Sequence, residues 1–350
     1  MSHETPTQSH AHADARCQRV LRLIETLDVL PTTVHVPVRL LDLRRKGSAG
    51  ATDFADILSA DPALSARVLA LANSASYAPV RPIIRLGDAV SIVGLNNLFS
   101  FVFGVSLAGI FNNMGLPARE LNGLRKASLL KSVAAREFAR RFAPTMIEEA
   151  WLGGLLQDVA VPIMYAADQG MWNTLVGLLD STDAGRTEQE VSLFGRDHLW
   201  LGRAVAQKIG LPDLYQQIIA HHHQSVPLER ALGASSIGLT RALQFASVLP
   251  HRPGTTDPDR FAPRLRHWIP VSRDRAKEEA TLSELVSAIA VGYKAILQLV
   301  GDSDEDTGGA GFKQFLADLS SEVVRSFEST IGTCASEISR LDREVRQSAA

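Results

Sequence analysis

Apolar residues recur at helical spacing along almost the whole chain, and this periodicity limits the fold more than any other feature of the sequence. In residues 61–72, an aspartate and a proline precede Leu64, Val68 and Leu71, which fall on one helical face. Aspartate at the N-cap followed by proline is a strong helix-start signal. No segment shows the two-residue alternation and turn signals of paired strands. The sequence therefore predicts an all-α fold.

Stop signals divide this pattern into many short helices. Glycine or proline stands at most of the boundaries, for example at Pro117, Pro144 and Gly210. Short connections between many helices predict one compact multi-helix domain. The expected helices cover residues 52–59, 62–72, 86–93, 98–111, 121–142, 147–166, 171–179, 188–194, 198–209, 213–223 and 232–249.

The two ends of the chain differ from this helical middle. The start is polar and lacks the apolar stretch of a signal peptide, and the segment after Pro250 is rich in proline, arginine and aspartate. The C-terminal helices either complete the core or form an appended pair, and an apolar stripe in the last one packs on the core or on a partner. We expect a disordered tail at 1–20, the domain at 21–250, a loop or weakly ordered excursion at 251–280, and C-terminal helices at 281–345.

Charge and cysteine content exclude several classes of function. Lysine and arginine total 36 against 38 acidic residues, so no imbalance points to nucleic acid or an anionic membrane. The longest apolar run, 98–111, is too short to span a bilayer. Cys17 and Cys334 lie far apart and form no CxxC pair, which disfavours a disulfide framework and a thiolate zinc site. We expect a cytoplasmic protein.

One group of residues could carry chemistry. The phosphate-loop, dinucleotide, nucleophile-elbow and HExxH motifs are absent, whereas His198, His222 and His223 fall near two predicted helices. Asp158, His198 and His222 could converge on a metal ion, since imidazole and carboxylate are its usual ligands. Asp158 could instead bridge helix ends, and a histidine at a helix start is commonly structural. Spacing alone favours the structural reading.

Four segments in order resemble the HDOD family, the HD-related output domain of bacterial signalling proteins. They read ILSADPALSARVLALANSASY, IRLGDAVSIVGLNNLFSFVFGVSL, WLGGLLQDVAVPIM and FGRDHLWLGRAVAQKIGLPDLYQQIIAHHHQ. The resemblance covers residues 27–249, about two thirds of the chain. It implies an all-helical fold related to the HD metal-dependent phosphohydrolases.

In those phosphohydrolases a histidine, a His-Asp pair and a later aspartate hold the metals. The resemblance places these positions at Lys131, Gln157 with Asp158, and Ser247, so only Asp158 is retained. A glutamine amide is a poor ligand, and a lysine ammonium brings positive charge where a cation should bind. We expect weak metal affinity and a charge pair between Lys131 and Asp158, with the two groups within about 6 Å.

The related HD-GYP phosphodiesterases carry additional histidines. His198 and the His222-His223 pair resemble those positions, whereas Gln224 stands where that group has glutamate, and the glycine-tyrosine-proline signature is absent. Asp158, His198 and His222 could therefore still hold a metal weakly.

The resemblance implies a non-catalytic signal-transduction output or scaffold module with a degenerate HD site and no cofactor. We expect it to act through a signalling protein partner or a small ligand, with a homodimer as a further option and no membrane or nucleic-acid partner. The alternatives are a sensor that binds a nucleotide or cyclic dinucleotide without cleaving it, and an active metal-dependent phosphohydrolase.

Overall fold

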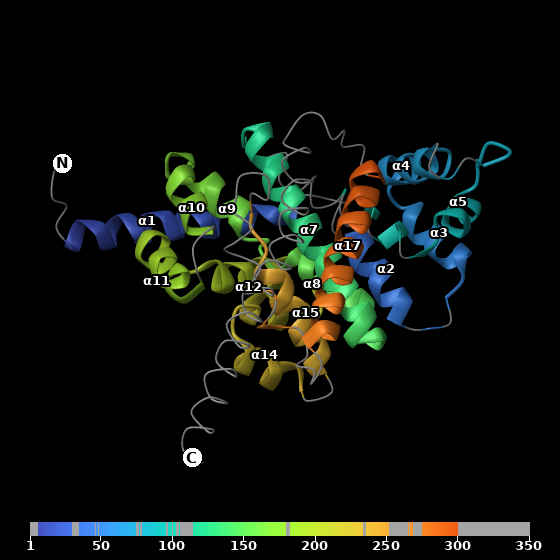
Figure 1. Ribbon diagram of the computed structural model, residues 1–350. Coiled ribbons are helices and arrows are strands. Elements are labelled where there is room, and N and C mark those ends of the chain that lie inside the picture. Colours follow the sequence, from blue (N-terminus) through green and yellow to red (C-terminus); the bar gives the residue numbers. More distant parts are fainter. Residues whose placement is uncertain are drawn as a thin grey trace, which may run out of the picture.

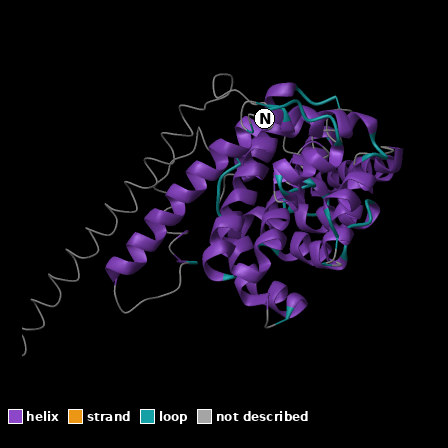
Figure 2. Cartoon of the chain, turned by 90° about the vertical axis from the view of Figure 1, so that its right-hand side faces the viewer, coloured by secondary structure: helices purple, strands orange, loops and turns teal. Residues whose placement is uncertain are grey.

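All regular structure that can be described in this chain is helical. A computed structural model describes residues 6–29, 35–45, 47, 49–74, 77, 79–95, 97–99, 101–102, 105, 115–179, 183–233, 236–251, 265, 267–268 and 275–299. Across these ranges every regular element is a helix (Figure 2). The all-α prediction is confirmed.

The helices pack around one shared hydrophobic core (Figure 1). Short 3-10 helices lie at Thr26–Val29, Pro144–Met146 and Gln169–Met171. The α-helices are α1 (Pro6–Glu25), α2 (His35–Arg45), α3 (Ala51–Leu58), α4 (Pro62–Ala72), α5 (Leu86–Val93), α7 (Ala118–Phe142), α8 (Ile147–Leu156), α9 (Val161–Ala167), α10 (Trp172–Leu179), α11 (Asp183–Phe194), α12 (His198–Lys208), α13 (Asp213–His221), α14 (Ser225–Leu232), α15 (Ile237–Ser247) and α17 (Arg275–Leu299).

Helix α7 is the centre of this arrangement. It packs against α8, α15 and α17. The rings of Phe138 on α7 and Phe245 on α15 are fully buried, and their centroids lie 5.1 Å apart. Because α7 also carries Lys131, the helices packed around it determine what that side chain contacts.

Two glycines allow the helices that carry the site to approach closely. A Cβ atom on Gly154 of α8 would lie 2.7 Å from the Lys131 carbonyl oxygen of α7, and one on Gly202 of α12 would lie 2.6 Å from Ile219 of α13. These distances are shorter than van der Waals contact, so any larger residue would push the helices apart. The glycines therefore hold α7 near α8 and α12 near α13.

The expected helix over 147–166 is wrong, because the structure divides it into α8 and α9. Pro162 has no N–H to donate to the Asp158 carbonyl four residues earlier. The Val161 N–H donates to that carbonyl instead, over 3.0 Å. The resulting turn places Gln157 and Asp158 at a break between two buried helices.

The remaining helix boundaries either lie close to the predicted ones or differ from them for a reason that one residue explains. Asp61 accepts a hydrogen bond from the Leu64 N–H, as the capping signal predicted, and α4 spans the expected residues. The expected helix over 232–249 is wrong in its first turn, since Gly233 has a φ of 82° and separates α14 from α15. Helix α13 ends at His221, two residues earlier than expected. Most of the predicted helix 98–111 lies outside the described residues.

The predicted disordered tail at 1–20 is wrong for the described part of that segment, because Pro6–Glu25 forms helix α1. Its Val20 and Ile24 side chains are buried in the core. Arg16 and Arg19 both pair with Asp168, at 2.8 and 3.4 Å. Long-range contacts therefore order a segment whose local composition is polar.

The predicted loop at 251–280 also needs correction, because α17 already begins at Arg275. Residues 275–280 read Arg-Ala-Lys-Glu-Glu-Ala, all of which are good helix formers. Leu282, Leu285 and Ile289 are buried, so α17 packs on the shared core rather than standing apart from it. The remainder of the predicted C-terminal helices, residues 300–345, lies outside the described residues.

Two described stretches are long and apolar enough to cross a membrane by length and composition alone. They are Pro144–Ala167 and Ala280–Leu297, of which 89% and 39% is buried inside the fold. The first is a core segment, since it contains α8 and α9. The second shares its buried side with α7, so neither is strong evidence for a membrane span.

Candidate functional site

Five polar side chains from distant parts of the chain meet in the core, and we call them the Asp158 cluster. Lys131 comes from α7, Asp158 from the turn after α8, His198 from the first turn of α12, His222 from the end of α13, and His251 from the segment after α15. All five side chains are buried. Buried polar groups of this kind must satisfy one another, because water does not reach them.

The shortest contact in the cluster joins Lys131 to Asp158. The Lys131 ammonium nitrogen lies 2.6 Å from Asp158 Oδ2 and 3.0 Å from His251 Nε2. The side chains of Lys131 and Asp158 are only 1% and 5% exposed. The charge pair expected from the sequence is therefore present, and it is almost completely removed from solvent.

The second oxygen of Asp158 faces the remaining members and an arginine. Asp158 Oδ1 lies 3.3 Å from His251 Nε2, 3.8 Å from His222 Nε2 and 3.9 Å from His198 Nε2. Arg186 of α11 reaches the same oxygen with a terminal guanidinium nitrogen at 3.5 Å. One carboxylate thus lies between a lysine, an arginine and three imidazoles.

Glu190 of α11 orients His198. One of its oxygens accepts from the His198 backbone N–H at 2.9 Å and lies 2.6 Å from His198 Nδ1. Its other oxygen accepts from Arg186 Nε at 3.0 Å. Glu190 is fully buried. A carboxylate on Nδ1 turns Nε2 of the same ring toward Asp158.

His222 is oriented in a similar way. Its Nδ1 donates to the Ile219 carbonyl at 3.0 Å, so its Nε2 carries the lone pair in the neutral ring. This Nε2 lies 3.4 Å from His198 Nε2. The neighbouring His223 ring meets His198 edge-on at a centroid distance of 5.1 Å and lies tilted against His222 at 4.2 Å. Two imidazole nitrogens and one carboxylate oxygen therefore point at a common space.

Two residues that the resemblance placed in the site do not take part in it. Ser247 donates to the Gln244 carbonyl of its own helix at 2.9 Å. The Gln157 side chain is fully buried, and its amide has no hydrogen-bond partner among the residues described. In the described part of the chain, neither side chain is hydrogen-bonded to Asp158. Gln157 neighbours Asp158 in sequence without sharing its contacts.

Three members of this environment were missed at the sequence level: His251, Arg186 and Glu190. His251 follows Pro250 in a stretch that we expected to be a loop. Arg186 and Glu190 form a pair four residues apart, which is also typical of a solvated helix face. The sequence offered one signal for these residues, which is that the Arg186–Glu190 pair shortly precedes the start of the helix that carries His198. Asp197 caps that helix, because its Oδ1 accepts a hydrogen bond from the Trp200 N–H.

Burial and neighbouring charges shift the pKa values of the cluster. Burial would raise the pKa of Asp158, but Lys131 and His251 hold it well below its usual range. Burial would likewise raise the pKa of Glu190, yet His198 and Arg186 lower it to about 2. Burial and the Lys131 charge lower the pKa of His251 to about 3. The carboxyl groups are therefore charged and His251 is neutral at pH 7.

These shifts predict loss of stability in acid. In the unfolded chain His251 binds a proton near pH 6.5 and Glu190 near pH 4.5, whereas in the folded protein both resist protonation. Stability should be fully present above pH 6.5 and fall as pH drops toward 3, by up to about 1.4 kcal/mol per pH unit for each group. His251→Asn should reduce the loss between pH 6.5 and 5 without abolishing it, because burial also lowers the pKa values of His222 and His223. Urea unfolding at several pH values measures this, and an unchanged slope in the variant would contradict it.

The geometry alone would suit a metal ion. Asp158, His198, His222 and His223 each offer one ligand atom, and these atoms all lie within 4.8 Å of one another. Ligands about 2.0–2.2 Å from one zinc ion lie roughly 3.3–3.6 Å apart, close to the spacing between the His198 and His222 nitrogens. Carboxylate support of the kind Glu190 gives His198 is usual for metal-bound histidine. The donor set fits a single cation.

The charges oppose that cation. Lys131 and Arg186 already balance Asp158 and Glu190, and the pKa shift keeps His251 neutral. A divalent ion would add two uncompensated positive charges next to a buried ammonium, which is costly in a low-dielectric interior. The residues fit the ion in shape but not in charge.

The family model of the HDOD domain matches residues 30–225, which is more than half of the chain. A search of curated proteins found no match. The matched residues include Lys131, Asp158, His198 and His222, whereas Ser247 and His251 lie beyond them.

Solved structures share the fold. An HDOD domain protein of unknown function from Geobacter sulfurreducens is 24% identical with a TM-score of 0.58, and the match covers 81% of this chain and 98% of that one. A protein from Marinobacter aquaeolei VT8, assigned provisionally to signal transduction, is 17% identical with a TM-score of 0.57, covering 83% of this chain and 67% of that one. At these identities the similarity establishes the helical architecture alone.

Proposed function

The chain belongs to the HDOD domain family, and we propose that it is a regulatory module of signal transduction without phosphohydrolase activity. In this proposal the domain acts through contacts with other proteins or through a small ligand. The HD-type site serves as a structural centre that joins five helical segments.

One observation carries the proposal: the Lys131 ammonium lies 2.6 Å from the only retained HD carboxylate. Resemblance to the HD phosphohydrolases assigns this position to a metal-binding histidine. The ammonium supplies a fixed positive charge in its place, and Arg186 supplies a second one at 3.5 Å. Asp158 then has the counter-charge that a buried carboxylate needs.

The burial of the cluster supports the same proposal. Metal-assisted hydrolysis requires an open coordination position, a bound water and access for the substrate phosphate. Lys131, His198 and His222 have no measurable exposure, and Asp158 is 6% exposed. A nucleotide phosphate could reach Asp158 only after the surrounding helices separate.

An activity assay tests the proposal directly. The full chain would be incubated with cyclic dinucleotides and with a phosphate monoester, each with manganese, iron or magnesium. We expect no turnover above the metal blank. Saturable binding without product that is lost in Asp158→Asn would favour a sensor that uses this site, and sustained turnover that disappears in the same variant would contradict the proposal.

A second candidate is a module that holds one structural cation. The convergence of ligand atoms from Asp158, His198, His222 and His223 favours it. In this case the metal would link the helices without activating a water for hydrolysis, because Lys131 already contacts one oxygen of the Asp158 carboxylate. The metal content of the purified chain separates this candidate from the metal-free one.

For partners, we propose a signalling protein in the cytoplasm. The support is the HDOD family itself and the scarcity of cysteine, which suits a reducing compartment. A second copy of the chain is an alternative partner, which sedimentation of the purified protein would reveal.

A further inference from the structure

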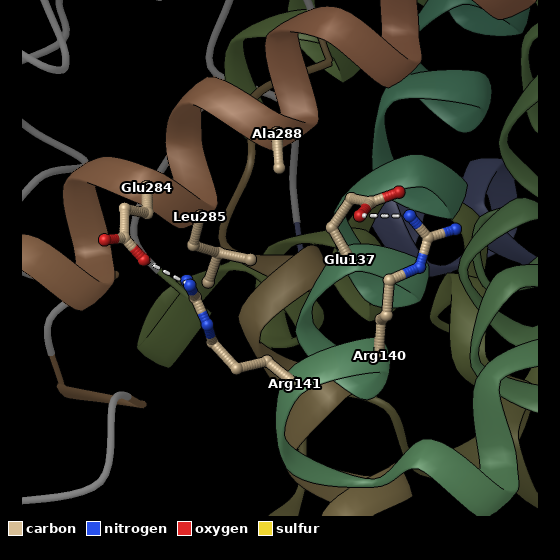
Figure 3. A pocket seen from close by; sticks show the side chains of 6 residues that line it. All are labelled: Glu137, Arg140, Arg141, Glu284, Leu285 and Ala288. Carbon is tan, nitrogen blue, oxygen red and sulfur yellow. Dashed lines mark hydrogen bonds and ion pairs between the residues drawn. The ribbon is translucent and has the colours of Figure 1, made fainter.

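A cleft between α7 and α17 lies apart from the Asp158 cluster. It has a volume of about 420 Å³ and is lined by Glu137, Arg140 and Arg141 of α7 and by Glu284, Leu285 and Ala288 of α17. Figure 3 shows an ion pair at each end of the cleft, with the side chains of Leu285 and Ala288 pointing from α17 into the space between them. Pockets of about 300–1,000 Å³ with an apolar wall and a few placed polar groups are typical small-molecule sites.

One end of the cleft carries excess positive charge. Glu137 is 7% exposed in its side chain and is shared by two arginines. Its Oε1 lies 3.2 Å from Arg136 Nε, and its Oε2 lies 3.2 Å from an Arg140 terminal nitrogen. One carboxylate thus faces two guanidinium groups. Arg140 is 59% exposed, so its other nitrogen atoms remain accessible to a ligand in the cleft.

The other end is held by a contact that a ligand can replace. Arg141 donates to the Thr281 carbonyl at 3.1 Å and pairs with Glu284. The Glu284 side chain is 64% exposed, and exposed ion pairs contribute little to stability. A ligand in the cleft can therefore displace the Glu284 carboxylate at little cost.

We propose that this cleft binds a small organic phosphate, with the phosphate on the exposed guanidinium of Arg140 at one end and an aromatic or other apolar group against Leu285 and Ala288. Arginine matches phosphate oxygens with two parallel hydrogen bonds, which lysine does not. The apolar wall distinguishes an organic phosphate from inorganic phosphate.

Such a ligand would join α7 to α17. Helix α7 also carries Lys131, so a ligand that strengthens the packing of α17 on α7 would stabilise the central helix of the fold. The site gives the domain a small-molecule input that leaves the buried Asp158 cluster closed. The proposal does not depend on whether that cluster is catalytic.

Calorimetric titration of the full chain tests the proposal with two probes, phenyl phosphate and AMP, at low salt. We expect saturable binding of both and at least fivefold weaker binding of inorganic phosphate. Arg140→Gln should weaken binding about tenfold or more, whereas Arg141→Gln, at the other end of the cleft, should weaken it less. Arg203→Gln, which changes an exposed arginine on α12, should leave the affinity unchanged.

A third variant keeps the test decisive if an arginine variant misfolds. Ala288→Phe fills the apolar side of the cleft while keeping both arginines, and circular dichroism checks its folding. It should reduce phenyl phosphate binding more than phosphate binding. The proposal is overturned if neither probe binds up to about 5 mM, if folded Arg140→Gln or folded Ala288→Phe binds like the unmodified chain, or if inorganic phosphate binds as tightly as both probes.

Discussion

Replacing Asp158 with alanine should destabilise the protein by about 3–5 kcal/mol, among the largest effects of any single substitution in the chain. The variant leaves the Lys131 ammonium buried without its carboxylate, and it removes a counter-charge from Arg186. Urea unfolding followed by circular dichroism measures the loss. A loss below about 1 kcal/mol would show that the pair is not buried as described.

A double variant provides the matched control for this first prediction. Lys131→Met combined with Asp158→Ala removes both charges and leaves Arg186 paired with Glu190 at 3.0 Å. Replacing a buried ion pair with apolar groups is often nearly neutral. The double variant should therefore be more stable than Asp158→Ala alone. If the two single losses simply add, Lys131 and Asp158 are not energetically coupled.

Glu190→Ala should destabilise the protein by a similar amount, about 3–5 kcal/mol. The fully buried carboxylate accepts from the backbone and side chain of His198 and from Arg186. Its removal leaves a buried guanidinium that is only 2% exposed and an imidazole without its orienting partner.

Glu188→Ala is the matched control, because Glu188 is exposed on the same helix. This change should alter the free energy of unfolding by no more than about 0.5 kcal/mol. Chemical denaturation compares the two variants under one condition. Equal stability of Glu190→Ala and Glu188→Ala would contradict the role given to Glu190.

Much of the fold follows from local sequence signals. The capping aspartate and proline before α4 predicted its start, and glycine marks the end of α5 at Gly94. The failures occur where distant contacts decide the structure. Helix α1 is held by the ion pair between Arg16 and Asp168, which lie far apart in sequence. The break after α8 follows from Pro162, which has no N–H to donate, so the Val161 N–H bonds to the Asp158 carbonyl within the buried segment.

The residues of the site likewise fall into those that the sequence predicted and those that only the packing of the helices revealed. Family motifs identified Lys131, Asp158, His198 and His222, because each lies in or near a recognisable segment. His251, Arg186 and Glu190 belong to no such motif, and they reach the cluster only through the packing of α11 and of the segment after α15. Charge balance in a buried site depends on all of these groups, so the sequence could not determine whether the cluster was already neutral.

The most direct test of the proposed metal-free site is the metal content of the full chain, measured by plasma mass spectrometry after expression with added iron, manganese and zinc and after dialysis. Because Lys131 and Arg186 already balance the buried carboxylates, we predict no stoichiometric metal. A stoichiometric ion that survives dialysis and is lost in folded His198→Ala would contradict this account.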